Sequence, residues 1–390
     1  MKPRHIVVIN LFFIGLVLFS SGMVYQFMTG QKPLSMLKSI GHHSTVASVK
    51  TTTCTNQPPL NLNGASTTAL QTLSVYQTAC HSRATGTMML FTSMPATEQE
   101  ATDYAKADAQ TLKDFAAHGV RPLVVAEPSE QNGTTLDYAT FANGGFNSQI
   151  TAYFQTLKNQ GITDTQLGIW NPFPEANLPY WNDNQPQYFA PAVNNYLGIL
   201  KQMFPGAHTS IMLNSATYRT TDFDWANGEY DSLLQYVKGI TPGLVEYAGM
   251  QGFPWMSPQG GNGAIVNAAE FLAPDLLKEM ADSLGTKKVW FNTGTFSAKY
   301  TLDPSQTVTM TPERRKAVMQ TINDQAVALQ KSGYTVAVNI FAQDKSRTAE
   351  ATNWSYWSAG KPFESPAAPV ITDFVNQLDQ EHIDFWLFDN

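Results

Sequence analysis

The sequence predicts a single (β/α)8 barrel, an α/β fold in which eight parallel strands alternate with eight helices. Short apolar runs alternate with stretches of helical periodicity along most of the chain. Successive runs begin roughly 35 to 45 residues apart, which suits one strand, one helix and their connections. No GxGxxG or other phosphate-binding loop follows any run, so a nucleotide-binding doubly wound sheet fits less well.

Seven runs have the length and composition of buried strands in a TIM barrel. They cover residues 87–94, 121–128, 166–173, 209–216, 243–253, 287–296 and 335–344. The eighth strand is expected at residues 73–80 (LSVYQTAC), where the pattern is weakest. This assignment makes residues 73–80 the first strand of the barrel and residues 166–173 the fourth.

Four stretches between these runs carry apolar residues at helical spacing, so each is expected to bury one face against the sheet. Their apolar positions are Ile150, Tyr153, Phe154 and Leu157; Phe189, Val193, Tyr196, Leu197 and Leu200; Leu272, Leu276, Met280 and Leu284; and Met319, Ile322, Ala326 and Leu329.

The composition excludes several classes of protein. Of the 390 residues 43% are hydrophobic, which is typical of a globular chain with a large core. Only 14% are charged, the formal net charge is -7, and no long basic run occurs, so nucleic acid is not expected as a partner. No Cys and His spacing suggests a zinc site, and no cofactor is predicted.

The chain begins with an export signal. Lys2, Arg4 and His5 precede an apolar run over residues 6–25, which just reaches the length of about 20 residues needed to span a bilayer. A cleaved signal peptide and an uncleaved anchor both fit this pattern; we favour the anchor, with its basic end in the cytoplasm. Both place the remaining chain outside the cytoplasm.

These patterns divide the chain into three regions. Residues 1–27 form the signal or transmembrane segment, residues 28–63 a flexible stalk rich in Ser and Thr, and residues 64–390 the barrel. Cys54 and Cys80 are the two cysteines of the chain. In an oxidising compartment they are expected to form a disulfide between the stalk and the start of the barrel.

Polar and aromatic residues gather after the strands. In a (β/α)8 barrel the carboxyl ends of the strands carry the active site. Flat rings stack on sugar faces, while amides and carboxylates bind hydroxyl groups, so these residues predict a polysaccharide or oligosaccharide ligand. The candidate substrate-binding residues are Asn177, Trp181, Tyr218, Gln251, Phe253, Trp255, Thr293, Trp354 and Trp357.

Four segments resemble glycoside hydrolase family 26, which includes many β-mannanases. PFPEANLPYW (172–181) is similar to the end of the family's fourth strand, and VEYAGMQGF (245–253) to its sixth. KKVWFNTGT (287–295) looks like the seventh strand, and the run from Val338 to Trp357 like the eighth with the tryptophan that follows. The resemblance implies a (β/α)8 barrel that hydrolyses a β-linked polysaccharide such as mannan.

By this resemblance Glu175 is the general acid/base. Phe173, Pro174 and Trp181 would strip water from its carboxyl group, which raises a carboxyl pKa. Asn177 is expected to bind a sugar hydroxyl, to orient Glu175 or to cap the next turn. Glu246, within its strand, is expected to be structural.

The second carboxylate is missing from its expected place. Retaining glycosidases need a nucleophile beside the acid, and the position that matches the family's nucleophile is Thr293. Three interpretations remain. In the first, the barrel is a degenerate carbohydrate-binding or adhesion module. In the second, Glu127 or Asp344 acts as the base of an inverting enzyme, unless Glu127 only pairs with Arg121 and Asp344 only with surface cations. In the third, a substrate acetamide is the nucleophile.

Overall fold

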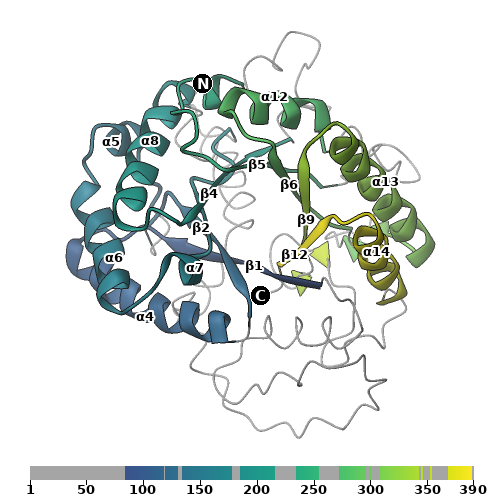
Figure 1. The fold of residues 1–390 in the computed structure, drawn as a ribbon, viewed down its shortest axis with the longest axis horizontal. Helices are drawn as coiled ribbons and strands as arrows, with labels where there is room; N and C mark the ends of the chain where they lie inside the picture. The colour runs from purple at the N-terminus through teal and green to yellow at the C-terminus, as the bar shows by residue number, and fades with distance from the viewer. Residues whose placement is uncertain are drawn as a thin grey trace, which may run out of the picture.

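Eight parallel strands form a closed barrel surrounded by helices (Figure 1). The computed structural model describes residues 84–117, 119–130, 134–177, 185–215, 234–253, 272–295, 298–299, 308–341, 344–345, 352–353 and 368–388. Around the ring the strands follow the order β1-β12-β9-β6-β5-β4-β3-β2. The predicted fold class is therefore confirmed.

The seven strands predicted with a clear pattern are all present. The barrel strands are β1 Ala84–Ser93, β2 Arg121–Glu127, β3 Ile169–Pro172, β4 His208–Asn214, β5 Tyr247–Gln251, β6 Lys288–Thr293, β9 Thr335–Phe341 and β12 Asp384–Phe388. The helices are α4 Glu98–Ala117, α5 Tyr138–Ala142, α6 Asn147–Asn159, α7 Asp164–Leu167, α8 Pro186–Met203, α12 Pro274–Leu284, α13 Pro312–Lys331 and α14 Ala368–Gln380. The predicted apolar positions on α6, α8, α12 and α13 are buried.

The prediction for the eighth strand is wrong. The strand that closes the barrel is β12, near the carboxyl terminus, which pairs in parallel with β1 on one side and β9 on the other. Residues 73–80 lie outside the described residues. Short apolar runs look alike in a sequence, and only the pairing of edges decides which of them completes a ring. One result is that Glu175 follows the third barrel strand along the chain, not the fourth.

A small second sheet lies outside the barrel ring. Its two-residue strands are β10 Asp344–Lys345, β11 Thr352–Asn353, β7 Ala298–Lys299 and β8 Val308–Thr309, and they pair antiparallel in the order β10-β11-β7-β8. These strands come from the segments that follow β6 and β9, so the sheet extends the connections after two adjacent barrel strands.

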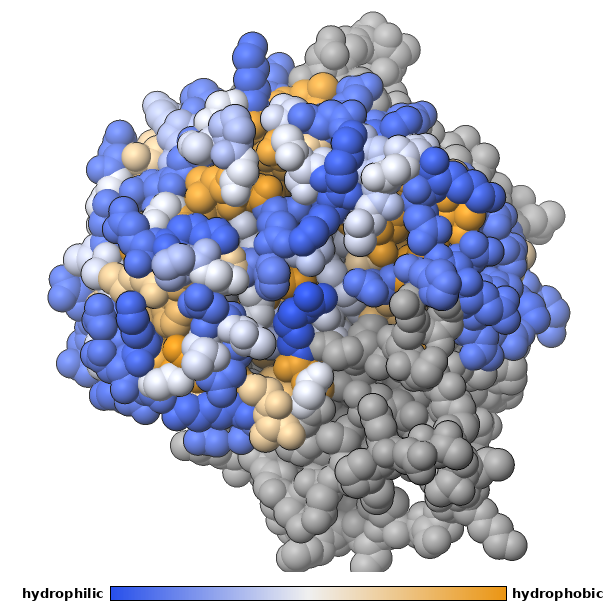
Figure 2. Space-filling view, in the orientation of Figure 1, coloured by the Kyte–Doolittle hydropathy of each residue, from blue (hydrophilic) through white to orange (hydrophobic). Residues whose placement is uncertain are grey.

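No helix among the described residues is long and apolar enough to cross a membrane. The predicted anchor over residues 6–25 lies outside them, as do Cys54 and Cys80. On the face seen in Figure 2 the surface is largely hydrophilic, with hydrophobic residues in small separate areas. Tyr188, at 37% exposure, is the one exposed large hydrophobic side chain in the described part of the chain.

Two buried tryptophans fill the middle of the barrel. The rings of Trp290 and Trp386 lie 5.5 Å apart, and the indole nitrogen of Trp290 donates to Ser210 Oγ at 2.8 Å. Gly249 on β5 pairs with Trp290 on β6. A Cβ atom at Gly249 would lie 2.4 Å from the indole ring, so the glycine makes room for Trp290.

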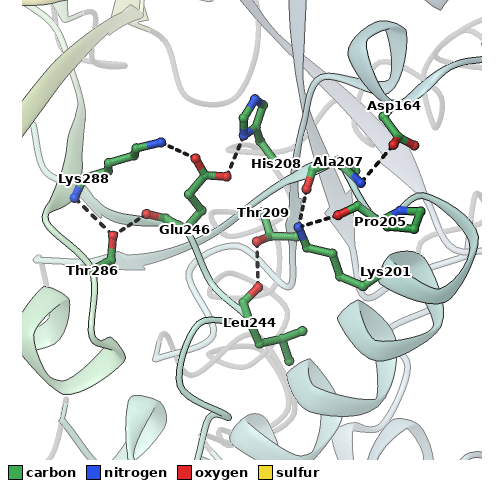
Figure 3. A network of polar contacts seen from close by, with 11 residues as sticks. Asp164, Lys201, Pro205, Ala207, His208, Thr209, Leu244, Glu246, Thr286 and Lys288 are labelled. Carbon is green, nitrogen blue, oxygen red and sulfur yellow. Dashed lines mark hydrogen bonds and ion pairs between the residues drawn. The ribbon is translucent and has the colours of Figure 1, made fainter.

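Ion pairs link the starts of three strands at the amino end of the barrel (Figure 3). The carboxylate of Glu246, just before β5, binds Lys288 through Oε1, and its Oε2 lies 2.5 Å from His208 Nδ1. Burial disfavours the charge of Glu246, but the bonds to Lys288 and His208 outweigh it and place its pKa below the ordinary 4.5. The expected structural role of Glu246 agrees with these contacts, because they join the starts of three neighbouring strands.

A carboxyl group is buried between the barrel and its outer helices. Asp108 on α4 is 5% exposed and accepts hydrogen bonds from Tyr153 at 2.5 Å and Thr92 at 3.3 Å, both through Oδ2. Its Oδ1 has no partner among the described residues. Burial raises the pKa of Asp108 to about 7, despite the two hydrogen bonds, which lower it.

Replacing Gly249 by Ala tests the packing of the barrel interior. Gly249→Ala should lower the free energy of unfolding by about 2 to 4 kcal/mol, because the new methyl group displaces a buried indole. Gly198→Ala is the matched control: it lies on α8 with no heavy atom within 4 Å of the added Cβ, and it should stabilise by up to about 1 kcal/mol. Urea titration measures both. Equal stability of Gly249→Ala and the wild type would contradict this packing.

Asp108 should make stability fall as pH rises. Its folded pKa of about 7 lies above its ordinary value of 3.8. The folded state therefore holds a proton between these values that the unfolded state releases, so stability is lost as pH rises through this window. Asp108→Asn removes the titration and keeps an acceptor for Tyr153.

The free energy of unfolding of Asp108→Asn relative to wild type should therefore rise by about 2 to 4 kcal/mol between pH 4 and pH 8. Asp103→Asn, an exposed position on the same helix whose carboxylate pairs with Lys106, should show a difference from wild type that changes by less than about 1 kcal/mol over the same range. Parallel pH profiles of Asp108→Asn and wild type would rule out a raised pKa at Asp108.

Candidate functional site

Buried polar side chains collect at the carboxyl end of the barrel. Each contributes to a layer that in most (β/α)8 barrels is filled by branched apolar residues. The group consists of Glu127, Glu175, Asn177, Asn214, Gln251, Asn292 and Asn339, all less than 9% exposed. Burying so many amides and carboxylates is costly unless they are hydrogen-bonded, so their contacts define the site.

The chain leaves β3 in an unusual conformation. Phe173 and Glu175 have φ angles of 54° and 53°, a region that costs residues other than glycine about 1 to 3 kcal/mol. Backbone hydrogen bonds from Phe173 to Ala126 O and from Glu175 to Met212 O, both 2.9 Å, tie this turn to β2 and β4. The neighbouring strands thereby hold the strained turn in place.

The turn points the side chains of Phe173 and Glu175 in different directions. The Phe173 ring packs 5.4 Å from Tyr138 and 4.7 Å from Phe141, under α5. The Glu175 carboxylate instead accepts hydrogen bonds at Oε1 from the side-chain amides of Asn214 and Gln251, which end β4 and β5. The aromatic packing of Phe173 thus helps to orient Glu175 toward the barrel mouth.

Glu175 is 6% exposed, which confirms its predicted burial. Its environment is not simply apolar, however. Hydrogen bonds donated by two amides stabilise a carboxylate and act against the loss of hydration. The raised pKa expected from the flanking aromatic residues stays a prediction.

Asn177 holds the site together from the other side of the turn. Its Nδ2 donates to Asn214 O at 2.7 Å, and its Oδ1 accepts from Asn214 N at 2.8 Å. This pair of bonds fixes the backbone of Asn214, whose side chain in turn donates to Glu175. Of the roles expected for Asn177, its contacts fit indirect orientation of Glu175.

Asn292, rather than Thr293, is the β6 side chain that reaches toward Glu175. Its Nδ2 donates to Gln251 Oε1 at 2.5 Å. Side chains alternate along a strand, so Thr293 faces away from Asn292; it is fully buried, and its hydroxyl has no partner among the described residues. A substrate-binding role for Thr293 stays a prediction that this orientation does not favour.

Glu127 lies at the end of β2, next to β3, and is 3% exposed. The alternative of a pair with Arg121 does not fit, because Arg121 begins the same strand about 20 Å away. Arg121 donates to Thr87 Oγ1 at 3.0 Å and lies over Trp386 at the amino end. Glu127 is therefore at the same end of the barrel as Glu175, on the neighbouring strand.

The remaining candidates are dispersed. Asp344 belongs to β10 of the small sheet and pairs with Asn353, so it does not end a barrel strand. Phe253 is partly buried, and its ring packs 5.6 Å from Phe341. Five predicted aromatic residues lie outside the described residues: Trp181, Tyr218, Trp255, Trp354 and Trp357. No three His, Cys, Asp or Glu residues in the described ranges are grouped to hold a metal ion.

Comparison with solved structures agrees with the barrel. An exo-β-1,4-mannosidase, Op5Man5 from Opitutaceae bacterium strain TAV5, superposes with a TM-score of 0.53 at 13% identity over 80% of this chain and 55% of that one. The apo structure of β-glucosidase 1317 gives 0.52 at 13% identity over 81% and 88%. A family 1 β-glucosidase from Thermotoga maritima, in complex with isofagomine lactam, gives 0.50 at 11% identity over 77% and 84%.

At these identities the likeness shows the fold alone. The sequence matches no protein-family model, and no curated protein matches it by sequence. Membership of glycoside hydrolase family 26 is therefore not confirmed. Any activity has to be argued from the side chains at the barrel mouth.

Proposed function

We propose that this protein is a glycoside hydrolase-like barrel that acts on a β-linked glycan, with Glu175 as its catalytic carboxylate. One observation carries the proposal: a strained turn after β3 places Glu175, 6% exposed, among amides from β4 and β5. Strain and buried polar groups persist where function requires them. The carboxyl end of the strands is where barrels of this fold place their catalytic residues.

Three further points support a glycan as the substrate. The solved structures that share the fold include an exo-β-1,4-mannosidase and a β-glucosidase. The segment from Pro172 to Trp181 resembles a family that contains many β-mannanases, which favours a mannan-type substrate. Sugar hydroxyls also match the amides and carboxylates at the barrel mouth.

The reaction would need a second carboxylate, and we assign this role to Glu127. Glycoside hydrolysis uses one acid to protonate the leaving oxygen and one carboxylate to activate water or attack the sugar. Glu127 and Glu175 end neighbouring strands on the same side of the barrel. Asp344, on the small sheet, and a substrate acetamide are the remaining sources of the second group.

Glu175→Gln tests the catalytic proposal. The amide keeps the size of the side chain but cannot exchange a proton or carry a negative charge. Turnover of unactivated β-linked oligosaccharides by the full chain should fall about 10²- to 10⁴-fold, while the affinity for the glycan changes little. A reducing-sugar assay and binding titration measure the two effects.

Glu279→Gln is the matched control, because Glu279 is exposed on α12; its turnover should equal that of the wild type. Equal hydrolysis by wild type and Glu175→Gln would refute the catalytic role. If both proteins bind the glycan and neither hydrolyses it, a second function fits: the barrel is a carbohydrate-binding or adhesion module. The amide of Asn292, where the resemblance implies a carboxylate on this strand, favours that alternative.

We also propose that the barrel lies outside the cytoplasm, tethered by residues 6–25 or released if they are cleaved. The basic residues before the apolar run and the two cysteines support this location. If the barrel is tethered, protease added to intact cells should degrade it. If residues 6–25 are cleaved, the medium should contain the barrel. Denatured, unreduced protein should show no free thiol, because Cys54 and Cys80 are paired. Two free thiols together with protection from protease would contradict export.

A further inference from the structure

Three amide side chains connect Glu175 to the far side of the barrel mouth. Asn339 on β9 donates from Nδ2 to Asn292 Oδ1 at 2.7 Å. Asn292 on β6 donates from Nδ2 to Gln251 Oε1 at 2.5 Å, and Gln251 on β5 donates from Nε2 to Glu175 Oε1. We call Asn339, Asn292 and Gln251 the amide relay. All three are buried, with exposures of 0%, 2% and 8%.

All donors of the relay point in one direction. Gln251 turns its NH₂ group toward Glu175 Oε1, so its carbonyl faces β6. That carbonyl can only accept, so Asn292 must donate to it, and Asn339 must then donate to Asn292. Every link therefore points its positive end toward Glu175.

We propose that the amide relay is a positioning device that keeps Glu175 ionised at the barrel mouth. This proposal rests on the function proposed above for Glu175. Aligned amides in a low-dielectric site polarise one another, so each link strengthens the next. Asn339, at the far end of the relay, acts on the carboxylate through Asn292 and Gln251.

The relay determines which half of the chemistry Glu175 performs. A carboxylate held in its ionised form serves as the base or nucleophile of glycoside hydrolysis, and the proton for the leaving oxygen comes from another group. Gln251 then acts by positioning Glu175 and not by binding the sugar directly. This assignment differs from the general acid role that the family resemblance implies.

Asn171 supplies an internal control. It is fully buried on β3, a barrel strand, but both of its side-chain polar atoms lack a partner among the described residues. It has the same chemistry and burial as Asn339 without a link to Glu175. A change at Asn171 therefore reports what the loss of an internal amide does by itself.

Side-chain amide resonances of the full chain, labelled with ¹⁵N in Asn and Gln and recorded without sugar, test the relay in the wild type. The NH₂ signals of Gln251, Asn292 and Asn339 should shift with one common midpoint as Glu175 takes up a proton. The Asn171 signal should not follow, and Glu175→Gln should abolish the common shift. Independent midpoints, or no response at Asn292 and Asn339, would overturn the proposal.

The variants Asn339→Leu and Asn171→Leu provide a second test of the relay. Asn339→Leu should raise the pH at which Glu175 is half protonated by roughly 0.5 to 1 unit, a threefold to tenfold change in proton affinity, because the relay loses its first donor. Asn171→Leu should leave this midpoint unchanged. Equal midpoints in both folded variants would also overturn the proposal.

The wild-type titration decides the question if Asn339→Leu does not fold. Because the titration contains no substrate, it tests the relay independently of hydrolysis. A protein that fails the assay of the proposed function can still show the common midpoint.

Discussion

Pairing of β12 with both β1 and β9 is the constraint on which the rest of the structure depends. These parallel contacts satisfy the edges of β1 and β9 and convert a curved sheet into a ring. Only in a closed ring do the ends of β2 to β6 and β9 converge on one axis. The amides of Asn339, Asn292 and Gln251 meet between neighbouring strands, whereas the contact between Gln251 on β5 and Glu175 after β3 spans β4 and needs the curvature of the ring.

The barrel interior changes character along its axis. Ion pairs around Glu246 join the strands at the amino end, and Trp290 and Trp386 fill the middle. Buried amides and carboxylates occupy the carboxyl end. The first two layers stabilise the ring, while the third contains strained backbone and polar atoms without a partner among the described residues. The stabilising contacts and the candidate site thus lie at opposite ends of the same strands, as is common for this fold.

The sequence predicted the burial of Glu175 but not its surroundings. Polar residues directly after buried strands are unexpected in a core, which singles out Glu175, Asn177 and Gln251; the catalytic role of Glu175 rests on the family resemblance. The sequence does not indicate a role for Asn339, because it lies inside an apolar run, where the pattern does not reveal the hydrogen-bond partner of a single polar residue. Thr293 was aligned with a nucleophile by position, but the alternation of β6 turns Asn292 toward the site. The sequence assigns residues 73–80 to the eighth strand and does not indicate β12, because short apolar runs do not reveal which edges they pair with.

What the sequence by itself determined is local: the alternation of strands and helices, and the buried faces of α6, α8, α12 and α13. Both depend on the periodicity or composition of neighbouring residues. Tertiary structure alone decided which strand closes the barrel, which way the side chains after β3 point, and which amides meet Glu175. The hydrogen bonds around Glu175 join residues 37 to 76 positions apart, from Asn214 and Asn177 to Gln251 and Glu175, and the closing strand pair joins Ala84 to Phe385. Hydrogen-bond partners so distant in the chain leave no periodic pattern, because their contact depends on which strands lie side by side in the barrel.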